Sequence, residues 1–222
     1  MSVNIAIDGP AGAGKSTIAK KIAKMLGYIY VDTGAMYRAM ALYLLKSDVP
    51  VEDGAAISAA CQDADISIEY INGEQVVLLN GENVNAYLRT EEVGNMASVS
   101  STNGDVRKKL VQLQQKLAQK ADVVMDGRDI GTCVLPNADV KIYLTASSYV
   151  RAKRRYEELL SKGETADLEK IEKDIIERDK RDMTREISPL KQAEDAVLVD
   201  SSDMTIDEVV SAIVNIIKTK KR

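Results

Sequence analysis

The chain has 222 residues, of which 45% are hydrophobic and 29% are charged, a composition that fits a folded globular protein and excludes a disordered one. Its 30 basic and 34 acidic residues give a net charge of −4, which argues against a broad nucleic-acid-binding surface and a nucleic-acid partner. Histidine is absent and only Cys61 and Cys133 are present, which excludes Ser-His nucleophiles, histidine-ligated zinc and a disulfide framework.

Residues 3–8 form an apolar, β-branched run that predicts a buried strand. This run starts at once, without a basic stretch, an apolar signal region or a cleavage site. No apolar run approaches the roughly 18 residues of a membrane-spanning helix. We therefore expect a cytoplasmic protein with no membrane partner.

A glycine-rich loop follows this strand and precedes a helix that begins near Lys15. It matches the P-loop pattern and comprises Gly9, Pro10, Ala11, Gly12, Ala13, Gly14, Lys15 and Ser16, with Thr17 next in the chain. Glycines let backbone N–H groups point at phosphate oxygens, and the helix start adds positive charge. Lys15 would reach the β- and γ-phosphates of ATP, and the Ser16 hydroxyl would ligate Mg²⁺. The alternative, a merely flexible glycine turn, explains neither the lysine nor the position of the loop between a strand and a helix.

The α/β alternation continues with a strand at 28–32 and a helix that Thr33 could cap. Residues 65–85 differ, because Asn72-Gly73 and Asn80-Gly81 separate alternating strand-like segments, and Asn-Gly is a strong hairpin signal. We expect a small antiparallel meander here, inserted beside the main sheet.

The remaining pattern predicts helices at about 91–101, 104–120, 148–161 and 167–182 and from Thr205, and strands at 121–126, 138–144 and 196–200. Buried strands that alternate with helices imply a parallel sheet covered on both faces. The terminal KTKKR is most simply a solvated helix end.

Asp126 ends one of these apolar strands and is the candidate for the acid on the Mg²⁺ side of a P-loop site. The alternative is that it only caps a loop. Arginines gather in two later sets, Arg151, Arg154 and Arg155, then Arg178, Arg181 and Arg185. Their spacing places members of each set on one helical face. They form either a solvated helix pair or a mobile arm that closes over phosphates and excludes water.

A GTP-binding switch protein is the rival from another class. The chain has neither the Asp-x-x-Gly nor the Asn-Lys-x-Asp stretch that such proteins use for Mg²⁺ and guanine. A P-loop kinase for another monophosphate or a small metabolite is the second alternative.

Five motifs, GPAGAGKST, VDTGAMYR, LRTEEVGNMAS, DGRDIGT and ERDKRDMTR, occur in this order across nearly the whole chain, which thereby resembles the longer type of bacterial cytidylate kinase. The resemblance implies the nucleoside-monophosphate-kinase fold, with a five-stranded parallel sheet covered by helices, an antiparallel β insertion and an arginine-rich lid. It gives one kinase domain over 1–222, with a core of 1–63, 103–150 and 189–222, the insertion at about 64–102 and the lid at about 151–188.

The resemblance also implies site residues. It places Arg38, Arg128 and Arg185 at the phosphate of CMP, and Arg178 and Asp182 at its ribose. The base would be read by Ser98, Arg107 and Asp129, since cytosine offers an amino donor beside acceptors. Thr33 stands near the substrate where some relatives carry serine, and Arg151, Arg154 and Arg155 lie on the ATP side.

The expected reaction is transfer of the γ-phosphoryl group of ATP to CMP, and to dCMP, with Mg²⁺ bridging the phosphates and no covalent intermediate. Lys15, Arg128 and Arg185 are the expected catalytic groups, because no general base is needed when the acceptor is already anionic. We expect the protein to be a monomer whose partners are small molecules.

Overall fold

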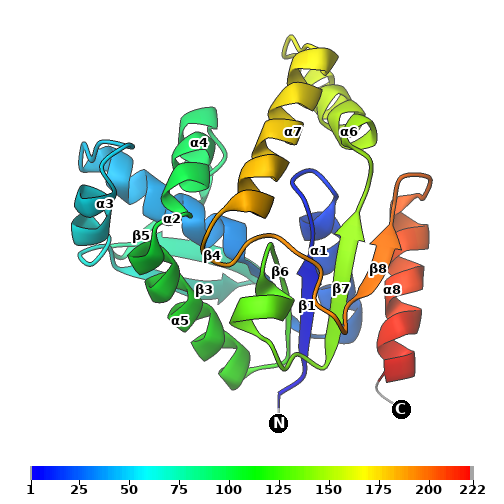
Figure 1. Ribbon diagram of the computed structural model, residues 1–222. Helices are drawn as coiled ribbons and strands as arrows, with labels where there is room; N and C mark the ends of the chain where they lie inside the picture. The colour runs from blue at the N-terminus through cyan, green and yellow to red at the C-terminus, as the bar shows by residue number, and fades with distance from the viewer. Residues whose placement is uncertain (1, 221–222) are drawn as a thin grey trace. The chain divides into compact units, whose positions relative to one another are not determined.

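The computed structural model describes residues 2–220 and contains two sheets, of which the larger is formed by short apolar runs in the sequence (Figure 1). The larger sheet has the order β2-β6-β1-β7-β8, in which β7 pairs in parallel with both β1 and β8. Its strands are β1 Asn4–Asp8, β2 Ile29–Asp32, β6 Val123–Gly127, β7 Val140–Thr145 and β8 Val197–Asp200. The strand ranges expected from hydrophobic runs are confirmed within a few residues, as is the parallel sheet covered by helices.

Chain contacts group the described residues into two compact units. The first unit comprises residues 29–123 together with Ser2, and the second comprises 3–28 and 124–220. Each unit has its own buried residues, such as Met36 and Leu110 in the first and Ile7 and Ile142 in the second.

The second unit carries the P-loop at the carboxyl end of β1. Its helices are α1 Lys15–Leu26, α6 Ser148–Ser161, α7 Leu168–Thr184 and α8 Ile206–Lys220, with a π-helical turn at Ile130–Val134. Helix α8 packs against α1, and α6 and α7 run side by side as a helical hairpin (Figure 1). The expected helix ranges are thereby confirmed, whereas the π-helical turn has no signal in hydrophobic periodicity.

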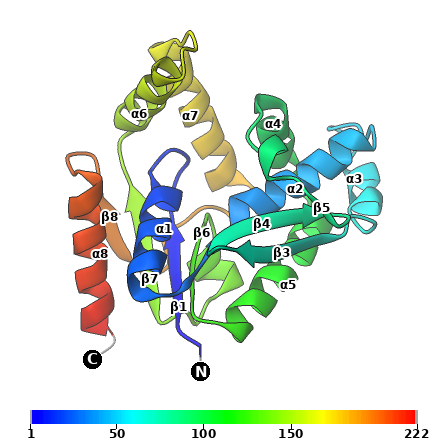
Figure 2. The same ribbon diagram turned by 180° about the vertical axis from the view of Figure 1, so that it is seen from behind.

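The first unit contains the expected antiparallel meander, β3 Ile66–Ile71, β4 Glu74–Leu79 and β5 Glu82–Asn83 (Figure 2). Both Asn-Gly pairs form its turns, with φ values of 54° and 78° at Asn72 and Gly73 and 51° and 82° at Asn80 and Gly81. Two consecutive left-handed residues are the geometry of the type I′ hairpin turn, which confirms the meander.

The helices of this unit are α2 Thr33–Lys46, α3 Gly54–Ala60, α4 Glu91–Ser100 and α5 Gly104–Lys120, with a 3₁₀ turn at Asn85–Tyr87. Helix α2 packs against α4 and β4. The expected cap of α2 was wrong by one residue, because the Asp32 side chain accepts the N–H of Ala35 and Thr33 is the first helical residue. Helix α3 was not expected, since its sequence GAAISAA is short and carries little apolar periodicity. Among residues 2–220, none of the helices has both the length and the apolar character needed to cross a bilayer.

Candidate phosphate and nucleotide site

The P-loop is shaped by glycines at positions that exclude or disfavour another residue, Gly9 for lack of space and Gly14 for its left-handed backbone. Gly9 has φ 148°, and a Cβ built on it would lie 1.9 Å from the carbonyl oxygen of Leu144 on β7. Gly14 is the N-cap of α1 with φ 84°, in the left-handed region. The loop therefore runs from β1 directly into a helix start, whose unpaired N–H groups and dipole favour an anion.

Lys15 lies inside this loop rather than in solvent. Its side chain is buried, and Nζ donates a hydrogen bond to the carbonyl oxygen of Pro10 at 2.7 Å. Burial lowers the pKa of the Lys15 amine well below its ordinary value, and the nearby Arg128 guanidinium acts in the same direction. A phosphate next to this amine would favour its charged form.

Ser16 and Asp126 place two oxygen ligands together beside the P-loop. The Ser16 Oγ donates to Oδ2 of Asp126 at 2.9 Å, and Asp126 is buried at the end of β6. Hydroxyl and carboxylate oxygens are the ligands that Mg²⁺ prefers, so this pair fits the ion expected for a P-loop kinase.

The loop after β6 meets the end of α7 through two ion pairs. Nε of Arg128 lies 2.9 Å from Oδ2 of Asp182, and Nη2 of Arg185 lies 3.4 Å from Oδ1 of Asp129. The Arg185 Nε also donates to the carbonyl oxygen of Ser188 at 2.7 Å. Four residues expected at CMP, from two distant segments, therefore form one charged cluster in the second unit. A fifth, Arg178, lies half-buried on α7.

Asp8 belongs to the same region, and sequence reasoning missed it. Its carboxylate accepts hydrogen bonds from the backbone N–H groups of Ile130 and Gly131 at 2.8 Å and 2.7 Å. Burial raises the pKa of Asp8 to about 6, although both hydrogen bonds act to lower it. The sequence feature that could have identified Asp8 is its position as an acidic residue at the end of an otherwise apolar strand.

The arginines expected on the ATP side differ in their surroundings. Arg151 is buried, and its Nε and Nη1 donate to the carbonyl oxygens of Ala146 and Ala11, both at 2.8 Å, while Nη2 lies 2.6 Å from Oδ2 of Asp179. Arg154 donates to the carbonyl oxygen of Ser201 at 2.7 Å. Arg155 pairs with Glu158 at 2.9 Å, and both of these side chains are about half exposed. Arg151 therefore connects α6 to the P-loop and to α7.

Four further residues expected at the substrate lie in the first unit: Thr33, Arg38, Ser98 and Arg107. Thr33, Ser98 and Arg107 are buried, and Arg38 is half-buried. The Arg107 guanidinium lies 5.6 Å from the ring centre of Tyr37 and donates to the carbonyl oxygen of Ser101 at 3.2 Å. The aromatic ring therefore helps to hold the Arg107 guanidinium in place. Tyr37 was not expected at the site, although it lies within the VDTGAMYR motif.

A protein-family model described as cytidylate kinase matches residues 5–219 of the chain. The chain belongs to the cytidylate kinase family. It is 51% identical to a cytidylate kinase of Ligilactobacillus salivarius over 98% of this chain and 97% of that protein. It is 50% identical to a cytidylate kinase of Caldicellulosiruptor bescii over 96% of this chain and 95% of that protein.

Solved structures give the same fold at lower sequence identity. A gluconokinase from Sinorhizobium meliloti has a TM-score of 0.52 at 13% identity and covers 99% of this chain and 94% of its own. A shikimate kinase from Acinetobacter baumannii has a TM-score of 0.50 at 15% identity and covers 100% and 96%. These likenesses confirm the P-loop kinase fold of this cytidylate kinase family member.

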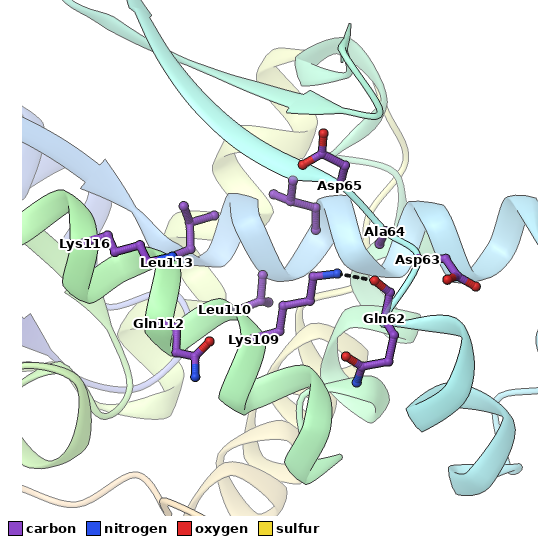
Figure 3. Close-up of a pocket in the computed structure, with 10 residues that line it drawn as sticks. Gln62, Asp63, Ala64, Asp65, Lys109, Leu110, Gln112, Leu113 and Lys116 are labelled. Atoms are coloured by element: carbon purple, nitrogen blue, oxygen red, sulfur yellow. Dashed lines mark hydrogen bonds between the residues drawn. The ribbon is translucent and has the colours of Figure 1, made fainter.

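One pocket of the first unit, of about 410 Å³, lies between residues 62–66 and helix α5 (Figure 3). At its edge Lys109 Nζ donates to the carbonyl oxygen of Gln62 at 2.7 Å, and also to that of Cys61 at 2.9 Å. None of the residues expected at the nucleotides is among the ten that line it in the described chain. Membership of the cytidylate kinase family therefore favours the P-loop and the charged cluster, and not this pocket, as the candidate nucleotide site.

Proposed function

We propose that this protein transfers the γ-phosphoryl group of ATP to CMP, and also to dCMP, to give ADP and CDP or dCDP. The observation that carries the proposal is the second unit's arrangement of a P-loop with buried Lys15 beside the Arg128–Asp182 and Arg185–Asp129 pairs. Membership of the cytidylate kinase family supports the choice of acceptor.

On the donor side, backbone N–H groups of residues 9–17 bind the phosphates of ATP, and Lys15 lies against the β- and γ-phosphates. Ser16 and Asp126 would hold Mg²⁺, whose positive charge would balance that of the phosphate oxygens. Lys15 is already buried in the loop, where it donates to the carbonyl oxygen of Pro10, so it reaches the phosphates with little reorganisation. Arg154 and Arg155, on the α6–α7 arm, contribute further positive charge when ATP is bound.

On the acceptor side, Arg38, Arg128 and Arg185 bind the phosphate of CMP, while Arg178 and Asp182 hold the ribose. A guanidinium presents five N–H donors, so Arg128 and Arg185 can bind phosphate oxygens while they keep their carboxylate partners. Ser98, Arg107 and Asp129 read the base, with the Asp129 carboxylate accepting from the cytosine amino group. Thr33 lies near the same substrate.

In the transfer step, an oxygen of the CMP phosphate attacks the γ-phosphorus in line, and the bond to the oxygen shared with the β-phosphate breaks to release ADP. The acceptor has a second pKa of about 6 and is anionic at neutral pH, so no protein base removes a proton. Catalysis therefore consists of alignment and of charge stabilisation by Lys15, Arg128 and Arg185. Closure of the arm at residues 151–188 would exclude water and prevent ATP hydrolysis. We expect the protein to act as a monomer in the cytoplasm.

The test is an assay of ADP release with ATP as donor and a panel of acceptors: CMP, dCMP, UMP, AMP, GMP, shikimate and gluconate. We expect CMP and dCMP to give the highest kcat/KM. Preference for a different acceptor would replace the proposal with a kinase of that substrate. Tight GTP binding without acceptor-dependent turnover would instead indicate a switch protein.

A further inference from the structure

Asp8 joins two loops that the proposed reaction needs. It is the last residue of β1, directly before the P-loop residue Gly9. Its two carboxylate oxygens each accept one backbone N–H, from Ile130 at 2.8 Å and from Gly131 at 2.7 Å. These residues directly follow Arg128 and Asp129 in the chain, so Asp8 ties the segment that carries both groups to the start of the P-loop.

The contact between Asp8 and this segment is close. A Cβ built on Gly131 would lie 3.0 Å from Cδ of Lys141 and 3.3 Å from Oδ2 of Asp8, so a side chain at this position would force its neighbours to move. Lys141 directs its Nζ away, to the carbonyl oxygen of Pro136 and to Asp195. The segment therefore rests between the Asp8 carboxylate and the Lys141 alkyl chain.

The charges around Asp8 do not supply a stabilising ion pair. The negative charge of Asp129 acts to raise the pKa of Asp8, and Lys15 acts weakly to lower it. Tyr143, the parallel neighbour of Asp8 on β7, has a pKa that burial raises, so it is neutral at physiological pH. Asp8 is therefore a buried carboxylate whose main partners are two backbone N–H groups, an arrangement that is unfavourable for stability in itself.

We infer that Asp8 is a positioning residue for phosphoryl transfer, whose carboxylate holds the loop that carries Arg128 and Asp129 in a fixed place relative to the P-loop. This inference rests on the proposed function. Asp8 touches neither substrate; it aligns the arginine that binds the acceptor phosphate with the loop that binds the donor. A misplacement of about 1 Å between reacting groups lowers the rate about 100-fold, so the contact that Asp8 makes between the two loops has a large effect on the rate.

The test is the Asp8→Asn variant, in which an amide NH2 group replaces one carboxylate oxygen and cannot accept an N–H. We expect kcat with ATP and CMP to fall at least about tenfold and the KM for CMP to rise, because loop alignment is lost. The KM for ATP should change less than about threefold, since the P-loop glycines and Lys15 remain. In the free protein, exchange of the Ile130 and Gly131 amide hydrogens, measured by NMR, should become faster.

Asp139→Asn is the matched control. The Asp139 carboxylate also accepts a backbone N–H, from Asn4 at 2.8 Å, but at the opposite end of β1 from Asp8. This variant should keep normal kinetics and normal amide exchange at Ile130 and Gly131. Asp8→Ser is a second variant at the site itself, because its short hydroxyl cannot hold both amides. We expect it to show the same kinetic and exchange changes as Asp8→Asn.

Two results would overturn the inference: normal kcat in a folded Asp8 variant, or reduced kcat with unchanged exchange at Ile130 and Gly131. A wild-type protein that turns over a different acceptor contradicts the proposed function instead. In that case the comparison of kcat and amide exchange is made with the acceptor found, and a normal kcat in the Asp8 variants again overturns the positioning role.

Discussion

The guanidinium of Arg151 on α6 lies 2.6 Å from the carboxylate of Asp179 on α7, and both residues are buried. Two further donors of Arg151 bind carbonyl oxygens, one of them in the P-loop. This pair therefore holds the helical hairpin together at its base, next to the phosphate loop. Arg154 and Arg155, on the same helix, are more exposed than Arg151.

The Arg151→Ala substitution should lower the free energy of unfolding by about 3 kcal/mol, because it leaves the Asp179 charge buried without its partner. The control is Arg155→Ala, which removes the half-exposed pair with Glu158 and should cost at most about 1 kcal/mol. Urea denaturation of the two variants measures both values. Equal, small losses would show that the Arg151–Asp179 pair does not stabilise the hairpin.

Lys15→Ala should reduce kcat at least about 100-fold, because it removes a positive charge that stabilises the transferring phosphoryl group. The fold should remain intact, since the buried Lys15 amine is held in an environment that lowers its pKa and does not favour its charge. Steady-state kinetics and a melting curve check both statements. A variant that retains more than about a tenth of wild-type kcat contradicts the proposed role of Lys15.

Asp129→Asn should relax base selectivity. UMP carries a carbonyl oxygen where CMP has its amino group, and two acceptors that face each other in a partly dry site repel. An amide at residue 129 can donate, so the ratio of kcat/KM for CMP to that for UMP should fall at least about tenfold, or about 1.4 kcal/mol.

Asp182→Asn is the control for this experiment, because Asp182 pairs with Arg128 and is proposed to hold the ribose, which both nucleotides share. It should lower kcat/KM for CMP and UMP by similar factors. An unchanged CMP-to-UMP ratio in Asp129→Asn would rule out base reading by this residue.

Asp8 should make stability depend on pH. Its pKa is about 6 in the folded protein and 3.8 ordinarily, so the folded state binds the proton more tightly than the unfolded state does. The stabilising contribution of the protonated group is complete below the ordinary pKa and is lost as the pH rises through about 6. Relative to Asp8→Asn, the wild-type free energy of unfolding should therefore decrease by at most about 3 kcal/mol between about pH 4 and about pH 7. Urea denaturation across this range measures the difference, and a constant difference would show that Asp8 ionises normally.

The sequence alone determined those features that depend on neighbouring residues in the chain. The glycine spacing around Lys15 predicts a phosphate loop because backbone conformation there is a local property. The pairs Asn72-Gly73 and Asn80-Gly81 predict hairpin turns for the same reason, and both turns are present. Alternation of apolar runs and helical spacing predicts the parallel sheet, and five ordered motifs indicate the family.

Only the tertiary structure decided which partners each polar side chain has. Asp8 meets the amides of Ile130 and Gly131 across more than a hundred residues of chain, and Arg151 meets Ala11 across a similar separation. No local pattern encodes such contacts, because they arise when parallel strands bring their carboxyl ends to one edge of the sheet. Whether a charged group is buried, and hence how far its pKa shifts, depends on the same packing. In the sequence Asp8 is an ordinary aspartate at the end of a strand, whereas in the fold it is a buried carboxylate with a raised pKa.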